Sequence, residues 1–363
     1  MGVISKDKIK EAALARYRKV KAARMSLRAA DDDKALSRHA QPLTSHERHL
    51  ISERWRGIIP HIDYGYAGFE VFKGLRGFSE DYVPSSFYYP YIVRSLNPGR
   101  YYRGFDNKCL APMLFPAARQ PRTLGMRIRG SYQIDGTGVD TDTFASMLRQ
   151  TKVPFIIKQA AQSCCGMNIH LIDPAGPMPD IRQILLSTDA DIIVQEVVEQ
   201  SPSTARFNPS SLNTFRITSL NINGRTSICS RTLKMGAPGN IVDNIGGAGG
   251  GLMAGVSAEG VIDSLGSTAT GTLADTHNGI RFGGMTIPAF DRVEKMVTET
   301  HSAFPYCGIV GWDIALDKLD RAVLIEANIW WPGTLIEQIC TGPMFGNRTE
   351  EMIDYVASHP MEL

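Results

Sequence analysis

The chain has 363 residues, 43% of them hydrophobic, and its 39 basic and 37 acidic residues leave a formal charge of +2. This is enough for roughly two or three domains with a substantial core. The balanced charge gives no general case for nucleic acid as a partner. No apolar stretch approaches the ~20 residues of a membrane span, and the N-terminus lacks the apolar region of a signal peptide. Six scattered cysteines without a CxxC pair favour reduced thiols, so we expect a cytoplasmic protein.

The first thirty residues depart from this charge balance, with nine Lys and Arg against two Asp and Glu. Ile9, Ala13, Tyr17 and Val20 recur at helical spacing, so the region 1–43 is predicted to hold a basic amphipathic helix. Such a helix can lie on an anionic membrane surface, which would give a peripheral contact at the inner face of the membrane. The alternative that we favour is a solvated helix that packs on the body of the protein through this weak apolar stripe.

The rest of the chain divides into three predicted regions with an α+β pattern. Residues 44–121 mix short helical patterns with aromatic turns and form an expected N-terminal domain. Residues 122–200 alternate strands at 124–132, 155–158, 169–173 and 191–198 with helices near 141–149 and 180–187. Residues 201–363 carry strands at 214–222, 226–234, 307–317 and 321–328, and helices near 289–303 and 349–358.

Two lysines are candidates for holding phosphates. Lys158 ends an apolar strand and is followed by a loop of small residues, 160–168. A lysine beside a loop with free backbone N–H groups can bind phosphate, although no Walker pattern is present and the indication alone is weak. Lys108 precedes this region and could reach the same phosphates, but a lone lysine is more often a surface residue.

The segment that links the second and third regions suits a nucleotide base. It contains Gln195, Glu196, Val198 and Glu199 directly after an apolar strand. At such a linker an adenine can bond to backbone atoms of Glu196 and Val198, while Glu199 reaches ribose hydroxyls. An ordinary interdomain hinge would have the same appearance.

Asp313, Glu326 and Asn328 are the most informative residues of the chain. They lie on two predicted neighbouring strands whose apolar, β-branched sequence is typical of buried strands. Glu326 and Asn328 are two residues apart and therefore point to the same face. Oxygen donors of this kind suit Mg²⁺, which usually binds together with substrate phosphates. The alternative is that the two carboxylates cap strand ends and meet lysines at the surface; the convergence of three donors favours a nucleotide and metal site.

These blocks together resemble an ATP-grasp enzyme, and most closely the sugar-transfer-associated ATP-grasp family of surface-polysaccharide gene clusters. The order of the blocks 106–108, 155–158, 194–198, 311–313 and 326–328 is that of the family. Between them, Asn213 to Arg216, Arg231 to Gly236 and the pair Asp243-Asn244 resemble further patterns of that family. The match covers roughly residues 100–345, which is more than a single motif.

The resemblance implies two α+β subdomains that grip ATP, the small one at 122–200 and the large one at 201–363. It places Lys108 and Lys158 at the phosphates and Asp313, Glu326 and Asn328 on Mg²⁺. ATP-grasp ligases generally activate a carboxylate as an acyl phosphate, which an amine or thiol then attacks. Phosphoryl transfer needs charge neutralisation and positioning, and arginines facing the site would stabilise the transferred group. Arg216 and Arg231 are the candidates for that catalytic role.

Two departures from the pattern concern the site itself. Many ATP-grasp ligases have an arginine two residues before the first metal ligand, where this chain has Gly311, so Arg216 or Arg231 must supply that charge. The turn after Asn328 is lengthened, and Trp330 and Trp331 are candidates for an acceptor pocket or for ordinary core. A glycine loop at 246–251 does not follow a strand–turn–helix pattern, so we interpret it as a segment near the γ-phosphate or acceptor, or as a structural turn.

Three functions are weighed. The leading one is an ATP- and Mg²⁺-dependent ligase that joins a small-molecule carboxylate to an amine or glycan precursor in surface-polysaccharide biosynthesis or modification. The second is a phosphotransferase of the same fold. The third is a nucleotide-binding regulatory protein without turnover, which the intact set of Lys158 and the three oxygen donors disfavours. Oligomeric state is left open.

Overall fold

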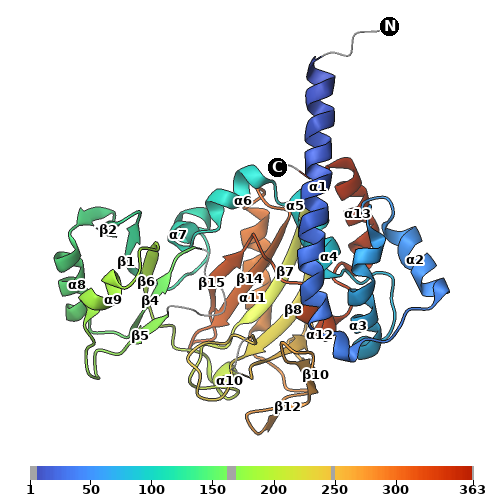
Figure 1. The fold of residues 1–363 in the computed structure, drawn as a ribbon. Helices are drawn as coiled ribbons and strands as arrows, with labels where there is room; N and C mark the ends of the chain where they lie inside the picture. Colours follow the sequence, from blue (N-terminus) through green and yellow to red (C-terminus); the bar gives the residue numbers. More distant parts are fainter. Residues whose placement is uncertain (1–5, 162–168, 247–249, 362–363) are drawn as a thin grey trace.

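The computed structural model describes residues 6–161, 169–246 and 250–361. They form an α+β fold of two antiparallel sheets with a helical N-terminal region, as the sequence predicted. In Figure 1 the smaller sheet and its helices form a lobe at the left, while the larger sheet stands at the centre with the N-terminal helices beside it. No helix of the described ranges is both long and apolar enough to cross a membrane.

The small lobe is a six-stranded sheet with two helices packed on one face. Its strand order is β3-β2-β1-β6-β4-β5. The strands are β1 Thr123–Ile128, β2 Ser131–Ile134, β3 Thr137–Val139, β4 Phe155–Gln159, β5 His170–Ile172 and β6 Ile192–Glu196. Helices α8 (Thr141–Gln150) and α9 (Ile181–Leu186) begin at Asp140 and Asp180, whose side chains accept the N-terminal backbone N–H groups. Their apolar residues share a core with one sheet face, which leaves Lys158 on the other face.

The large lobe is built on a seven-stranded sheet of order β11-β10-β9-β8-β7-β14-β15. The strands are β7 Phe215–Ile222, β8 Arg225–Met235, β9 Leu252–Val256, β10 Ile262–Ser267, β11 Leu273–Ala274, β14 Ile309–Leu316 and β15 Ala322–Asn328; β12 Thr276–His277 and β13 Ile280–Arg281 form a separate hairpin. Asn223 and Gly224, both with positive φ, make the two-residue turn between β7 and β8. Helix α11 (Phe290–Ser302) packs through Phe290 and Val293 against one face of this sheet. The opposite face carries the candidate site.

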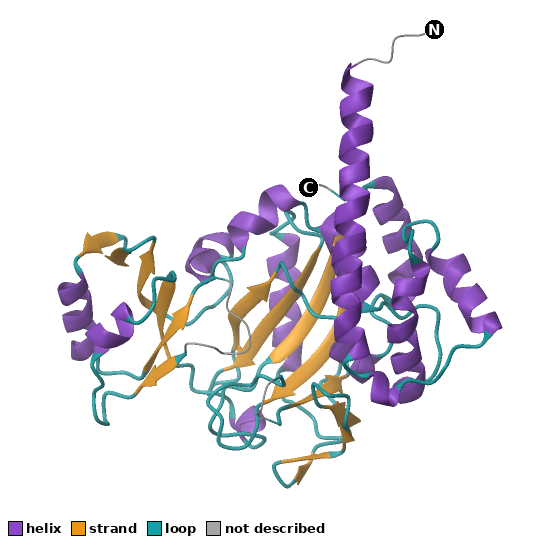
Figure 2. Ribbon diagram, viewed as in Figure 1, coloured by secondary structure: helices purple, strands orange, loops and turns teal. Residues whose placement is uncertain are grey.

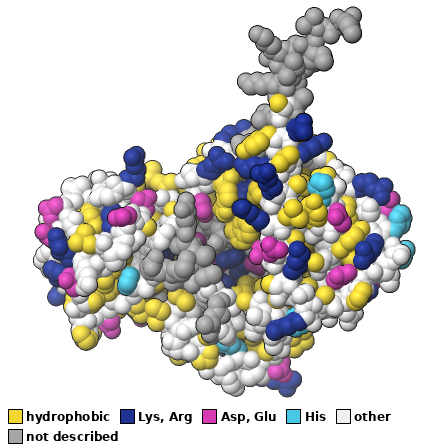
Figure 3. All heavy atoms as spheres, viewed as in Figure 1, with side chains coloured by type: hydrophobic (Ala, Val, Ile, Leu, Met, Phe, Trp, Pro, Cys, Tyr) yellow, Lys and Arg dark blue, Asp and Glu magenta, His cyan; other side chains and the backbone are white. Residues whose placement is uncertain are grey.

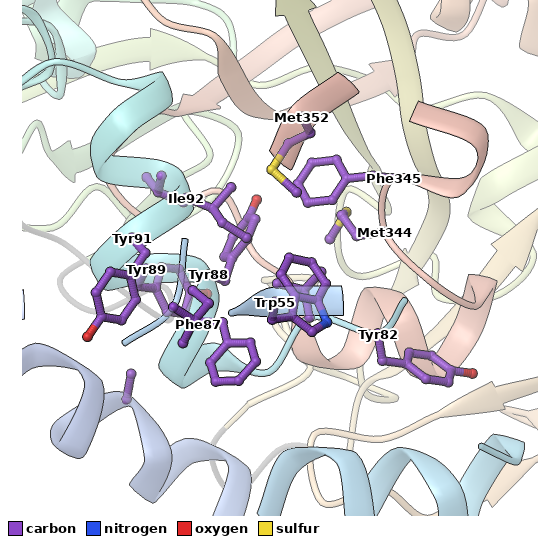
Figure 4. Close-up of a cluster of buried hydrophobic side chains, with 14 of the residues drawn as sticks. Trp55, Tyr82, Phe87, Tyr88, Tyr89, Tyr91, Ile92, Met344, Phe345 and Met352 are labelled. Carbon is purple, nitrogen blue, oxygen red and sulfur yellow. The ribbon is translucent and has the colours of Figure 1, made fainter. Parts of the chain in front are cut away.

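The N-terminal region is helical throughout its described part and shares a core with the large lobe. Its elements are α1 Lys6–Lys34, η1 Ser37–His39, α2 Ser45–Trp55, η2 Ile62–Gly65, α3 Tyr66–Arg76, α4 Ser85–Phe87, η3 Tyr88–Val93, α5 Arg94–Leu96, α6 Gly99–Phe105, η4 Lys108–Leu110 and α7 Ala111–Leu114. One hydrophobic cluster joins Trp55, Phe87 and Tyr88 to Met344 and Met352 of the C-terminal segment (Figure 4). The predicted N-terminal domain is thus packed onto the large lobe rather than standing apart from it.

The C-terminal segment completes that cluster and lies beside the candidate site. It contains α12 (Leu335–Thr341), η5 (Gly346–Arg348) and α13 (Thr349–Ser358), and the short α10 (Pro202–Ala205) precedes β7. Helix α12 contacts β8, β9 and β10. Gln338 on this helix is fully buried, and its side chain bonds to both the N–H and the carbonyl of Val83. These hydrogen bonds connect the N-terminal helices to helix α12.

Helix α1 packs through small residues and not through the stripe expected from the sequence. Ala22, Ser26 and Ala29 are buried at helical spacing against the helices around α4. Tyr17 and Val20 are instead 57% and 46% exposed. The prediction that these two residues make the packing stripe is therefore wrong. Figures 1 and 2 show the N-terminal half of α1 projecting beyond the rest of the protein.

The strands and helices predicted in residues 141–358 are confirmed to within a few residues. The segment 124–132, predicted as one strand, is instead the hairpin β1–β2, turned at Arg129 and Gly130 with positive φ at both. Strands β9 to β13 and helices α10 and α12 were not predicted. They are short, and several lie among glycine-rich sequence that carries little periodicity.

Candidate active site

Two β-bulges bring the predicted oxygen donors and a cation to one face of the large sheet. Leu316 to Ile314 pair regularly with Ala322 to Leu324, but Asp313 then pairs with Glu326, which leaves Ile325 as the extra residue. Without that bulge Glu326 would point to the opposite face from Asp313. Asn328 pairs with Gly311 one step further along. The three side chains therefore share one face of β14 and β15.

Asp313 is the most strongly paired carboxylate of this face and is only 5% exposed. Arg216 on β7 donates to both its oxygens, from Nε at 2.7 Å and from Nη2 at 3.0 Å. Lys234 Nζ on β8 lies 3.2 Å from Oδ2. Burial alone would raise the pKa of Asp313, but Arg216 and Lys234 hold it well below its ordinary value. Asp313 is therefore an anion held in a fixed position.

Lys234 is a residue of the site that the sequence analysis missed. It is 8% exposed and also lies 3.3 Å from Asp243 Oδ2. Asp243 in turn accepts from the backbone N–H and the hydroxyl of Thr214 at the start of β7. The glycine loop that follows, interpreted above as a segment near the γ-phosphate or acceptor, lies partly outside the described residues, since 247–249 are not included.

The two lysines predicted to bind phosphates come to the same place from outside the large sheet, Lys108 from η4 and Lys158 from β4 of the small lobe. Lys108 Nζ lies 2.9 Å from Glu326 Oε1, and its backbone N–H donates to the carbonyl of Ala160 at 2.8 Å. Lys158 is 7% exposed on β4. Burial lowers its pKa to about 8, an effect that Glu326 opposes and Lys108 reinforces. The greater part of the predicted phosphate loop, 162–168, lies outside the described residues.

The predicted base-binding segment lies at the end of β6. Gln195 is 4% exposed and pairs across the strands with Ile156, so it shares the sheet face of Lys158. Its side-chain oxygen is buried and has no hydrogen-bond partner within the described part of the chain. Glu196 is bound to Arg122 through its carboxylate and its backbone N–H. Glu199 is exposed and holds Lys318 at 3.0 Å.

Arg231 is the predicted residue that the structure does not bring to this face. Ser219 pairs with Ile228 and Thr218 with Ser230, so Cys229 is an extra residue in β8. The bulge places Thr232 opposite Arg216 and turns Arg231 to the other face, where it forms an ion pair with Glu294 of α11. Lys234, two residues after Thr232, is the cation that β8 brings to the face of Asp313.

This arrangement gathers Lys108, Lys158, Arg216 and Lys234 around Asp313, Glu326 and Asn328, where the two lobes meet. In Figure 3 the surface is hollowed beside the small lobe, with basic and acidic side chains along its large-lobe edge. The model of the sugar-transfer associated ATP-grasp family matches residues 180–353, which include β7 to β15 and the three oxygen donors. This part of the chain belongs to that ATP-grasp family.

Solved structures and curated proteins give further comparisons for this ATP-grasp chain. The VanG D-Ala:D-Ser ligase of Enterococcus faecalis is 12% identical, with a TM-score of 0.43 over 70% of this chain and 61% of that one. An L-amino acid ligase of Bacillus licheniformis is 14% identical, with a TM-score of 0.41 over 72% of this chain and 49% of that one. The chain thus spans about three fifths of the first protein and about half of the second. Comparison with curated proteins gave no significant match.

The donor chemistry of the ATP-grasp site fits Mg²⁺ held jointly with a nucleotide. The carboxamide nitrogen of Asn328 donates to Gly311 at 3.2 Å, which leaves its oxygen as the group that can face a cation. Within the described ranges no group of three or more His, Cys, Asp and Glu could hold a metal by itself. Mg²⁺ commonly takes one or two carboxylates and completes its shell with phosphates and water. Asp313, Glu326 and Asn328 meet that requirement.

Position 311 has room only for a glycine, because the segment after Asn328 passes close to it. A Cβ at this position would lie 2.3 Å from the carbonyl oxygen of Pro332, which belongs to the segment after Asn328. An arginine there is therefore excluded, and the guanidinium of Arg216 occupies the space beside Asp313. Of the two arginines predicted to supply this charge, Arg216 lies beside Asp313, and Arg231 lies on the opposite face of the sheet.

Replacing Gly311 by Ala is expected to destabilise the protein by about 1–3 kcal/mol, because the added methyl group overlaps the backbone of Pro332. Urea unfolding measures the loss. Gly138→Ala on β3 is the matched control, since nothing lies within 4 Å of a Cβ there. Equal stability of both variants and the wild type would show that the turn does not press on Gly311.

Proposed function

We propose that the protein is an ATP- and Mg²⁺-dependent ligase that joins a carboxylate to an amine through an acyl phosphate, in the synthesis or modification of a surface polysaccharide. One observation carries this proposal: the oxygen donors of β14 and β15 in the large lobe face two amines from other parts of the chain, Lys108 of η4 and Lys158 of the small lobe. Lys108 contacts Glu326 directly, and Lys158 is close enough for Glu326 and Asp313 to act on its pKa. The phosphates of ATP between these groups would be neutralised by the two lysines on one side and by the Mg²⁺ held by the oxygen donors on the other.

The base and ribose of ATP are proposed to lie along the end of β6. The unpaired Gln195 oxygen supports this placement, because a buried acceptor without a partner costs ~1–3 kcal/mol and an adenine amino group can satisfy it. The backbone N–H of Glu196 is already used by Arg122, so the contacts from the chain are assigned to the backbone of Val198 and the carbonyl of Glu196. Glu199 would leave Lys318 to reach the ribose.

The residues of the chain would perform the reaction by holding charge in place. Bound Mg²⁺ would neutralise the phosphate oxygens next to Asp313, Glu326 and Asn328. Lys108 and Lys158 would orient the phosphates, with Lys108 exchanging its Glu326 partner for them. Arg216 lies 3.6 Å from Glu337 and makes two hydrogen bonds to Asp313, so its guanidinium is held in place. It would stabilise the negative charge on the carboxylate that is phosphorylated and on the oxyanion that forms when the amine attacks.

Incubation with ATP, Mg²⁺ and candidate acids, with and without amines, tests the reaction type. A ligase releases free phosphate and forms an amide only when both the acid and the amine are present. A phosphotransferase leaves a phosphorylated acceptor in the absence of any amine. No turnover with any pair, together with tight ATP binding, would favour the regulatory alternative.

Replacing Lys158 by Met is expected to raise the Kd for ATP about 10- to 100-fold, because a hydrogen bond to a charged group contributes ~1.5–3 kcal/mol. In the wild type the affinity should be constant below about pH 8 and fall above it, since free Lys158 loses its proton there and phosphates bind the protonated form. Calorimetry at several pH values measures both effects. Lys73→Met, which removes a lysine paired with Glu47, is the control. An unchanged Kd in Lys158→Met would remove the phosphate assignment.

The exposed face of α1 is proposed to contact an anionic membrane surface. Arg16, Arg24 and Arg28 are exposed on the same face as Val20 and Leu27, opposite the buried Ala22 and Ser26. Basic residues beside apolar ones fit anionic headgroups. We expect the protein to sediment with vesicles that contain about 30% phosphatidylserine but not with neutral vesicles. Replacing the three arginines by Gln should abolish this sedimentation, and equal sedimentation with both vesicle types would contradict the proposal.

A further inference from the structure

Arg94 is a buried cation that the proposed reaction does not use. It is 4% exposed, and neither terminal nitrogen of its guanidinium has a hydrogen-bond partner within the described ranges. The group lies over the ring of Trp330 at 3.7 Å from the ring centre and over that of Tyr102 at 4.6 Å. Burial lowers the pKa of Arg94, and the neighbouring Tyr102 partly opposes this. No carboxylate of the described residues forms an ion pair with it.

An unpaired buried charge is unusual because it is costly. Taking an ion out of water costs several kcal/mol, and it is ordinarily recovered through a partner of opposite charge. The faces of Trp330 and Tyr102 offset only part of this cost, because a cation over a ring gains less than it loses in hydration. A neutral side chain of similar size would fill the same space more favourably. The guanidinium therefore requires an explanation outside the packing of the free protein.

The helix that carries Arg94 has an irregular backbone with a visible cause. The segments α4, η3 and α5 run without a break from Ser85 to Leu96, and η3 is π-helical. Pro90 has no N–H, so the carbonyl of Ser86 cannot receive the regular helical bond, and the hydroxyl of Ser26 bonds to it at 2.7 Å instead. Such π-helical turns occur frequently at functional sites.

This helix is fixed to the segment that follows the metal-binding residues. The side chain of Asn97 donates to the carbonyls of Ile309 and Ile329 at 2.8 Å and accepts from the N–H of Ile309 at 3.0 Å. Tyr89 stacks on Trp331 with ring centres 3.5 Å apart. Arg94 is thereby held beside the chain one and two residues after Asn328. Its place is next to the proposed Mg²⁺ end of the site.

We propose that Arg94 binds a carboxylate or phosphate group of the acceptor substrate, between the faces of Trp330 and Tyr102. The proposal rests on the ligase function above and names the class of acceptor: a molecule with an oxyanion in addition to the group that reacts. A guanidinium presents parallel N–H groups that match two oxygens of such an anion. Because the nitrogens are shielded by Trp330, which is itself 38% exposed, the anion reaches them when this indole shifts.

Trp330 and Trp331 make the binding observable. The other two tryptophans, Trp55 and Trp312, are fully buried, so an anion at Arg94 should alter the fluorescence chiefly through Trp330. The full chain is titrated with inorganic phosphate and, in a second arm, with acetate, at constant ionic strength. A saturable change with phosphate alone identifies a phosphate site, a change with acetate alone identifies a carboxylate site, and either supports the proposal.

Arg94→Met should weaken this response at least tenfold, whereas Arg182→Met, which removes an exposed arginine of α9 in the small lobe, should respond like the wild type. In the absence of anions Arg94→Met should melt at or above the wild-type temperature, and phosphate should raise the melting temperature of the wild type only. A merely structural arginine would give a lower melting temperature and no anion effect. Should Arg94→Met fold poorly, Arg94→Lys retains the charge and is expected to bind more weakly.

No saturable response of the wild type to either anion, or an equal response of Arg94→Met, would overturn the proposal. Binding of Mg²⁺ with ADP is measured on the same samples. If the wild type binds Mg²⁺ and ADP but gives no anion response, the Arg94 site is rejected and the ligase proposal stands. If the wild type does not bind Mg²⁺ and ADP at all, the ligase proposal itself is rejected.

Discussion

Replacing Glu326 by Gln should abolish Mg²⁺-dependent turnover while the protein remains folded. The amide keeps the size and one oxygen of the side chain but removes the charge that Mg²⁺ would meet beside Asp313. A bound cation supplies several kcal/mol to phosphoryl transfer, so the loss should be on the order of 10²-fold or more in kcat/KM. ATP hydrolysis in the presence of acceptor measures this loss, and thermal unfolding checks the fold.

The matched control is Glu294→Gln. Glu294 forms an ion pair with Arg231 on the opposite face of the same sheet, as Glu326 does with Lys108 on the site face. Both carboxylates are partly buried, so both substitutions remove one comparable ion pair. We expect Glu294→Gln to keep its activity. A loss of activity in both variants would mean that the effect comes from the sheet and not from the metal position.

Replacing Asp313 by Asn should be the most destabilising of these substitutions, by about 3–5 kcal/mol, because Arg216 and Lys234 lose the buried anion that they share and keep only Glu337 and Asp243, respectively. Urea unfolding measures the change. The double variant Asp313→Asn with Arg216→Met should recover part of the loss, since the uncompensated guanidinium is removed as well. If the loss of stability in the double variant equals the sum of the losses in the two single variants, the charge-pairing account is contradicted.

The pH dependence of the Asp313 effect follows from its lowered pKa. A carboxyl whose folded-state pKa lies below its unfolded value stabilises the protein fully above the unfolded value of 3.8, and this stabilisation is lost as the pH falls toward the folded pKa. The difference in stability between the wild type and Asp313→Asn should therefore be constant near neutral pH and shrink below about pH 4. A constant difference down to pH 2 would contradict the assignment.

The strands of the site could be predicted from the sequence, but the register between them could not. Residue alternation places Glu326 and Asn328 together, whereas the position of Asp313 opposite Glu326 depends on the bulge at Ile325. If β7 and β8 paired regularly from the turn at Asn223 and Gly224, without a bulge, Arg216 would lie opposite Arg231. The bulge at Cys229 shifts the pairing by one residue, so Thr232 pairs with Arg216 and Lys234, two residues further along, shares its face of the sheet.

The N-terminal region was the least predictable part, because its role depends on contacts between distant segments. The sequence from Ser85 to Tyr91 suggests an aromatic turn, whereas in the structure it is helical and its first residues bond to the side chains of Asp33 and Ser26. The carboxylate of Asp33 accepts the backbone N–H of Ser85 at 3.1 Å, and burial raises its pKa to about 7. Nothing local in the sequence indicates these partners, and the position of Arg94 depends on them.

The central claim is that ATP and Mg²⁺ are bound together where the two lobes meet. Calorimetric titration with ADP, in the presence and absence of Mg²⁺, tests it most directly for the wild type and Glu326→Gln. We expect Mg²⁺ to raise the affinity of the wild type at least tenfold and to have little effect on the variant. An affinity independent of Mg²⁺ in the wild type, or an equal Mg²⁺ effect in both proteins, would contradict the assignment of Asp313, Glu326 and Asn328.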